Sequence, residues 1–197
     1  MSAGYPGQEG GYAVADVLFG DYNPAGRLPV TYYKSVDQLP LFDDYDMKGR
    51  TYRYFMDEPL YPFGYGLSYT TFKYDALEMP GEVKTGKPVK VKVRVTNTGK
   101  LPGDEVVQLY ITDEKASTPR PYLQLEGFER IHLYPGESKE IEFELSPHQF
   151  SMIGEDDERI IENGWFTISI GGGQPQIEGT SFVTGRIKLS GHDVSIE

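Results

Sequence analysis

Apolar and polar residues alternate along the chain from Phe72 onward, a period of two that is typical of β-strands with one buried and one solvated face. The clearest run is 89–96, in which four valines alternate with lysine, arginine and threonine. The same alternation predicts further strands at 106–112, 123–133 and 141–145. None of these runs has the length or the spacing of a helix, so this part of the chain is predicted to be mostly β.

Turn signals separate these strands. Asn163-Gly164 predicts a hairpin that joins a strand at 159–162 to a strand at 165–170. Ser146-Pro147 predicts a helical turn over 146–150, with the serine as N-cap. Six or seven short strands without intervening helices indicate an antiparallel β-sandwich. Residues 174–197 return to short alternation and are predicted to be an extra edge strand or an ordered tail.

The pattern before residue 60 is different. Residues 8–19 carry apolar side chains at helical spacing, and Gly20 stands where a C-cap glycine would end the helix. Residues 27–33 are predicted to form a short strand, whereas 34–59 have no clear period and are expected to be a linker. A helix of about a dozen residues is marginal in water on its own. We therefore expect its apolar face to be frayed or to be buried in a homodimer contact.

Residues 60–70, which we call the aromatic clasp, join the two patterns. Pro62, Gly64 and Gly66 stand among aromatic rings in this span, a composition that excludes a regular helix. Aromatic rings on a bent, ordered backbone are typical of a connection that is pinned to a surface. The clasp is therefore predicted to hold two parts of the molecule together rather than to bind a sugar.

Four sequence blocks resemble the closing part of glycoside hydrolase family 3. They occur in the family's order and spacing, and with the strands that follow the resemblance covers roughly residues 4–172. The blocks are Gly4-Tyr5-Pro6-Gly7-Gln8-Glu9-Gly10-Gly11, Ala15 to Thr31, Gly49-Arg50-Thr51-Tyr52-Arg53-Tyr54-Phe55, and the aromatic clasp.

The resemblance implies four parts. Residues 1–33 would be the C-terminal helix and strand of an incomplete α/β sandwich domain, and 34–71 the linker and clasp. Residues 72–173 would be a fibronectin type III-like (immunoglobulin-like) sandwich, and 174–197 a C-terminal extension. The family's catalytic barrel and most of its second domain would lie upstream, in a longer parent protein. Its catalytic carboxyl groups map onto no residue here, so this chain alone is predicted to be inactive.

Composition narrows the choice of partners. The formal net charge of −11 argues against nucleic acid and anionic membranes, because both require a basic face. No apolar run approaches the roughly 18 residues of a membrane span, and the absence of cysteine excludes disulfides and thiolate chemistry. The expected partners are the parent's N-terminal catalytic domains and, through them alone, an oligo- or aryl-glycoside substrate. The resemblance suggests a periplasmic or extracellular parent, whose export signal would lie upstream.

Several glycine-rich patterns are typical of phosphate or catalytic sites but lack a required part. Residues 81–87 have P-loop spacing, yet Pro88 replaces the Mg²⁺-binding Ser or Thr and a strand follows, so a β-turn is expected. Residues 171–173 follow a strand but precede no helix, and they are expected to end that strand. Ser68 lacks the second glycine of a nucleophile elbow. No cofactor site is predicted.

The candidate metal ligands lack the required spacing as well. The aspartates at 43, 44 and 46 lack the glycine and the distal glutamate of an EF-hand, and are expected to lie in a solvated linker that Arg50 and Arg53 hold down. The three histidines have no paired spacing for zinc. Neighbouring carboxylates at 43–44 and 156–157 should point apart, unlike the facing pair that glycoside hydrolysis requires. No catalytic residue and no metal ligand is predicted.

The function expected from the resemblance is that of a non-catalytic, structural part of a β-glucosidase or β-xylosidase that removes terminal β-linked sugars. Two alternatives remain open. A carbohydrate-binding module would need a planar row of exposed aromatic rings, whereas Trp165 is expected in the core or in an interdomain contact. An adhesion or protein-interaction sandwich would need a large apolar patch and a stable oligomer. Neither alternative accounts for residues 4–70.

Overall fold

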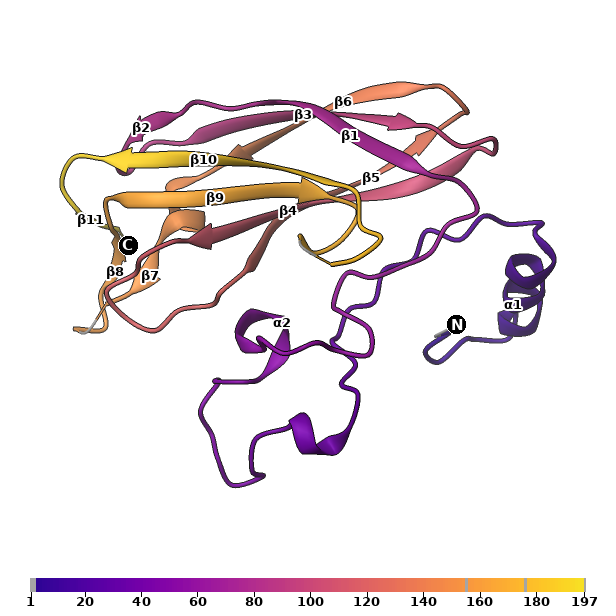
Figure 1. Cartoon of the computed structure of the whole chain (residues 1–197), viewed down its shortest axis with the longest axis horizontal. Helices are drawn as coiled ribbons and strands as arrows, with labels where there is room; N and C mark the ends of the chain where they lie inside the picture. The colour runs from indigo at the N-terminus through magenta and orange to yellow at the C-terminus, as the bar shows by residue number, and fades with distance from the viewer. Residues whose placement is uncertain (1–2, 155, 176, 197) are drawn as a thin grey trace.

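The computed structural model describes residues 3–154, 156–175 and 177–196. Two β-sheets form most of the molecule, and a smaller sheet lies at one end (Figure 1). The first sheet has the order β1 (Phe72–Glu78), β3 (Val89–Asn97), β6 (Ser138–Leu145). The second has the order β2 (Glu82–Lys84), β10 (Phe182–Ser190), β9 (Gly164–Gly171), β4 (Gly103–Asp113), β5 (Gln124–Leu133). The small sheet has the order β11 (Val194–Ser195), β8 (Arg159–Ile161), β7 (Met152–Ile153).

The core lies between the two larger sheets, as the alternating pattern predicts. All four valines of β3 are at most 1% exposed, and β6 pairs with β3 in an antiparallel register that places Val93 opposite Ile141. On the other face of the same pair Lys92 contacts Glu140 and Glu142 at 3.3 and 3.2 Å. The predicted antiparallel sandwich is therefore confirmed, with the charged face of β3 and β6 in solvent.

The predicted helical turn is also present, as η2 (Pro147–Phe150). Ser146 precedes it as the N-cap, and its backbone N–H donates to the side chain of Gln149 at 2.7 Å in a capping box. Phe150 at the end of the turn is buried and meets Phe166 edge-on in the core. The turn therefore closes one end of the sandwich.

The hairpin predicted at Asn163-Gly164 is wrong. β8 pairs with β7 and β11, whereas β9 pairs with β4 and β10, so the two segments belong to different sheets. A type I′ turn needs positive φ at both central residues, and neither residue is among those with positive φ. Instead the backbone N–H and side-chain amide of Asn163 both donate to Asp193, which turns the chain from one sheet to the other.

The C-terminal segment contributes more to the sheet than the predicted edge strand or ordered tail. β10 pairs with β9 from Phe182 to Leu189 and with β2 in parallel on its other side, so it lies inside the sheet. Its inward-facing Ile187 and Leu189 are buried in the core. Short alternation in the sequence predicted the strand, but not the partners on both of its sides.

The N-terminal part runs along one side of the sandwich (Figure 1). It contains α1 (Gly10–Phe19), the short η1 (Val36–Gln38) and α2 (Thr51–Tyr54). The predicted helix is confirmed, and it ends at Gly20, whose φ of 90° is left-handed. α1 stands clear of both sheets in Figure 1 and has no buried residue. None of the described helices is long and apolar enough to cross a membrane.

The strand predicted at 27–33 does not form. The segment contributes one isolated bridge, between Tyr32 and Tyr61, together with backbone hydrogen bonds from Leu28 to Tyr65 and from Gly64 to Leu28. A strand needs neighbouring strands to take up its backbone donors and acceptors, and in this chain the clasp alone lies beside it. The segment is therefore tied to the clasp rather than to a sheet.

Candidate functional site

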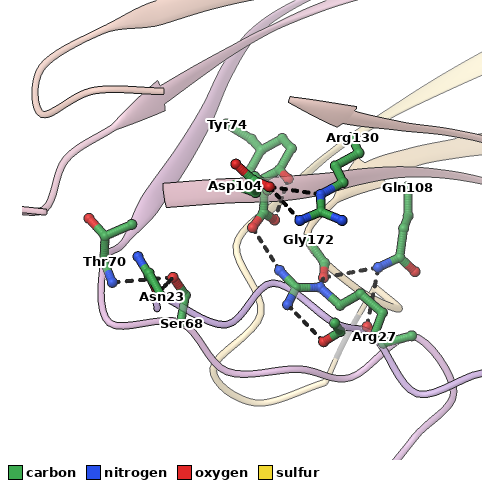
Figure 2. A network of polar contacts seen from close by, with 12 residues as sticks. Asn23, Arg27, Ser68, Thr70, Tyr74, Asp104, Gln108, Arg130 and Gly172 are labelled. Atoms are coloured by element: carbon green, nitrogen blue, oxygen red, sulfur yellow. Dashed lines mark hydrogen bonds and ion pairs between the residues drawn. The ribbon is translucent and has the colours of Figure 1, made fainter. Parts of the chain in front are cut away.

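A network of polar contacts joins the N-terminal part to the sandwich (Figure 2). Arg27 reaches from the N-terminal part to Glu105 on β4, with a distance of 2.7 Å between Nη2 and Oε2. The side chain of Arg27 is 11% exposed and that of Glu105 is 3% exposed. Arg27 Nε also donates to the carbonyl of Gly172 at 3.0 Å. One side chain thus joins the N-terminal part to β4 and to the segment after β9.

The carboxylate of Glu105 is satisfied on both oxygens. Its Oε1 accepts a hydrogen bond from the hydroxyl of Tyr74 on β1 at 2.8 Å. Burial raises the pKa of Glu105 above its ordinary value, and Arg27 and Tyr74 offset part of that rise. Burial, followed by the charge of Glu105, raises the pKa of Tyr74 well above its ordinary range, so the phenol stays a donor. A Cβ on Gly172 would lie 2.3 Å from Oε1, so the close approach requires glycine there.

The clasp meets the sandwich beside this ion pair. Gln108 Nε2 donates to the carbonyls of Gly64 and Gly172 at 3.2 and 3.1 Å, and its Oε1 accepts from the Tyr110 hydroxyl at 2.6 Å. Gly64 has a φ of 76°, and a Cβ there would lie 2.4 Å from Gln108 Oε1. Phe63 stacks on Tyr52 with ring centroids 4.2 Å apart. The clasp is therefore pinned to the outer face of β4, which agrees with its predicted role.

Asn23 forms the second anchor of the N-terminal part. Its Nδ2 donates to the carbonyl of Pro102 at 2.9 Å, and its Oδ1 accepts from the Ser68 hydroxyl and from the Tyr69 backbone N–H. The Tyr69 hydroxyl in turn donates to the carbonyl of Val17, near the end of α1. Asn23 thus connects the turn after α1, the clasp and the sandwich.

The contacts at this junction bind segments of the chain to one another. Glu105 is bound on both oxygens, and Arg27 divides its donors between that carboxylate and the carbonyls of Gly172 and Gly26. Hydrolysis of a glycoside needs a free carboxylate and a second carboxyl group across a substrate-sized gap. We assign the junction a structural role for that reason.

The glycine-rich and acidic segments that the sequence offered as candidate phosphate or metal sites are not part of this junction. Residues 81–87 contain β2 and a turn in which Lys87 N–H donates to the carbonyl of Lys84, as expected for a β-turn. Arg50 does hold the acidic loop, but through backbone carbonyls, including that of Asp46 at 2.9 Å, rather than through the carboxylates that we predicted. No group of three or more His, Cys, Asp or Glu side chains within the described ranges could hold a metal ion.

Trp165 does not lie in the core. Its side chain is 42% exposed, and the guanidinium of Arg186 covers its ring at 4.6 Å. Arg186 is held by both carboxylate oxygens of Glu114. The part of the prediction that placed this ring in the core is wrong, because Trp165 faces the opposite side of β9 from the buried Phe166.

Sequence reasoning missed Arg27 and Glu105. Glu105 has the same parity along β4 as the buried Val107, Leu109 and Ile111, so it is a charged residue on the core side of a strand. A buried charge requires a partner, and this is the signal that could have revealed the pair. The strand was predicted to begin at 106, which left Glu105 outside it.

Two family profiles match the chain. Residues 1–69 match the Glycosyl hydrolase family 3 C-terminal domain, and residues 105–174 match the Fibronectin type III-like domain. A xylan 1,4-beta-xylosidase of Xylanibacter ruminicola is 51% identical over 146 residues, which cover 74% of this chain and 17% of the relative. A periplasmic beta-glucosidase of Salmonella typhimurium is 43% identical over 192 residues, which cover 90% of this chain and 25% of the relative.

Solved structures of β-glucosidases also match nearly the whole chain. A beta-glucosidase from Listeria innocua in complex with glucose matches 95% of this chain with a TM-score of 0.81 and 31% identity, over 27% of its own length. Beta-glucosidase 3B from Thermotoga neapolitana matches 96% of this chain with a TM-score of 0.83 and 31% identity, over 28% of its length. The chain therefore spans between 17% and 28% of the length of these relatives.

Proposed function

Because this chain belongs to glycoside hydrolase family 3, as a C-terminal portion of its members, we propose that it is the non-catalytic support of the catalytic domains in a longer parent protein. The parent would be a β-glucosidase or β-xylosidase that removes terminal β-linked sugars. By the usual retaining mechanism of such enzymes, one carboxylate would act as nucleophile and a second carboxyl group as acid and base, without a metal. Both would come from the upstream domains.

The observation that carries this proposal is the distribution of exposed apolar side chains. Eighteen of the large exposed ones lie between Tyr5 and Tyr69, against seven in the rest of the described chain. Tyr12, Leu18 and Phe19 on α1 are 73%, 65% and 85% exposed. Large exposed apolar side chains that gather in one part of a chain are typical of an interaction site. In members of this family, the catalytic domains are the partner that we expect to cover these side chains.

The experiment compares the parent protein with and without residues 1–197, and also assays the chain alone. We expect no hydrolysis of p-nitrophenyl β-glucoside or β-xyloside by the chain alone. Removal of this portion should lower the stability of the parent together with its activity. Hydrolysis by the chain alone, abolished by a point change within it, would refute the proposal. So would a parent whose stability and activity survive the removal unchanged.

When the chain is present without the upstream domains, we propose that it forms a homodimer. The apolar face of α1 that the catalytic domains would cover is then available to the same face of another copy. Sedimentation equilibrium of the chain and of a variant with Leu18→Lys and Phe19→Lys tests this arrangement. We expect the dimer to weaken in the variant, and a monomer in both proteins at every concentration would refute it.

A further inference from the structure

An open groove of about 1250 Å³ lies between the outer face of the larger sheet and the linker. Its base is formed by β4, β9 and β10, and its walls by linker residues 46–59 and by the loop after β4, including 118–123. Pockets of about 300–1,000 Å³ hold drug-sized ligands, so this groove has room for more than a monosaccharide. It is separate from the ion pair of Arg27 and Glu105, neither of which lines it.

The base of the groove carries an array of hydroxyl groups. Thr112 lies opposite Thr167 on the neighbouring strand, and Ser169 lies opposite Thr184 on the next. The four residues line the groove. Ser169 is only 5% exposed and its hydroxyl lies 3.1 Å from that of Thr184, while the Thr167 hydroxyl donates to Glu114 at 2.8 Å. Thr112 and Thr184 are therefore the hydroxyls that are most open to a ligand. A hydroxyl both donates and accepts, so such an array matches a ligand that is itself rich in hydroxyl groups.

Aromatic rings and acidic groups flank this array. Tyr122 and Phe182 line the groove with 47% and 36% of their surface exposed, which leaves ring surface available to a ligand. Five carboxylate side chains but only two basic ones are found among its lining residues. One of the two, Arg120, is 7% exposed and already paired with Asp113 at 2.6 Å. The groove therefore disfavours an anionic ligand.

We propose that this groove binds a neutral oligosaccharide, with sugar hydroxyls on Thr112 and Thr184 and a sugar face against Tyr122. A polypeptide fits less well, because the cores of protein interfaces are depleted of charged residues. Most of the exposed apolar surface suited to a protein partner lies on α1 and along residues 36–45 instead. This binding would be a function of the chain itself and does not depend on the catalytic role proposed for the parent.

The test is a titration of the ¹⁵N-labelled 197-residue chain with xylotetraose and cellotetraose, followed by NMR, with tetragalacturonate as the anionic control. We expect shift changes for at least one neutral sugar at amides of β4, β9, β10 and 118–123, and none of comparable size for tetragalacturonate. Tyr122→Ala should weaken binding by about tenfold, as loss of an aromatic contact would. Tyr134→Ala removes a ring that is more exposed, at 64%, and that does not line the groove, and it should leave binding unchanged.

Thr112→Val provides a second test that keeps the shape of the strand side chain while removing one hydroxyl. It should weaken binding severalfold and leave the spectrum of the free protein native-like. The proposal is overturned if neither neutral sugar shifts the groove amides at millimolar concentration. It is also overturned if binding is the same in Tyr122→Ala and Tyr134→Ala, or if tetragalacturonate binds as well as the neutral sugars.

Discussion

The sandwich and the segment before it are stabilised in different ways. From Tyr74 onward, apolar side chains from two sheets fill a common core, whereas in the described segment before it Ala25 and Pro62 are the buried apolar side chains. That segment is attached instead through a few polar side chains, chiefly Asn23 and Arg27, and through the close approach of Gly64 to β4. The difference shows that the sandwich carries its own core, while the segment is attached to it through individual contacts.

The largest expected effect comes from a charge in the core of the sandwich. Val93→Asp would bury an unpaired carboxylate where the valine is 0% exposed, and should cost on the order of 4 kcal/mol or more in the free energy of unfolding. Lys92→Gln, one residue away on the solvated face, should cost about 1 kcal/mol or less because exposed ion pairs contribute little. Urea denaturation gives both values, and equal midpoints would show that the assigned faces are wrong.

The next effect comes from breaking the ion pair that attaches the segment. Glu105→Ala leaves Arg27 with its charge largely buried and unpaired, and should cost about 3–5 kcal/mol. Arg27→Met together with Glu105→Ala should cost less than the sum of the two single changes. Proteolysis within 20–70 should increase in each single variant. A double-mutant cycle without coupling would contradict the junction described above.

Gly64→Ala tests the approach of the clasp to β4, with Gly136→Ala as a matched control. The two glycines have φ of 76° and 77°, so both changes carry the same backbone penalty, of about 1 kcal/mol. Only at Gly64 does the new methyl group meet Gln108 and Tyr110, which should add about 1–3 kcal/mol. Equal unfolding free energies for the two variants would mean that the clasp is not held against the strand.

The smallest effect is a pH dependence that Glu105 contributes. Its pKa is raised in the folded state above the ordinary 4.5, so in the window between these values the folded protein binds a proton that the unfolded chain does not. The stability of the wild type relative to Glu105→Gln should therefore decrease as pH rises from about 4.5 through that window. Denaturation at a series of pH values measures the difference. A wild-type advantage that grows with pH would contradict the raised pKa.

The sequence predicted the sandwich well because alternation reports burial directly. The strand at 89–96 and the helical turn at 146–150 lie where the pattern places them. The hairpin at Asn163-Gly164 failed because a turn signal does not state which strands pair after the turn. Here Asp193, thirty residues further along the chain, accepts the hydrogen bonds from Asn163.

The junction was harder to predict because its contacts are remote in sequence. Arg27 and Glu105 are separated by 78 positions, and Gly172 is a further 67 along the chain. Nothing local to Arg27 indicates a partner on β4. The one local signal is that Glu105 lies on the core-facing side of β4. This signal can be read only if the start of the strand is placed correctly. The groove is likewise a product of tertiary structure, because three strands and two loops meet there.

The central claim is that α1 needs a surface that the rest of this chain does not provide. Amide hydrogen exchange at Gly10–Phe19 tests it, measured on the chain alone at several protein concentrations and on the parent protein, with Val89–Asn97 as the internal reference. We expect weak protection of α1 in the dilute chain, strong protection in the parent, and strong protection of β3 in both. Strong, concentration-independent protection of α1 in the chain alone would contradict the claim.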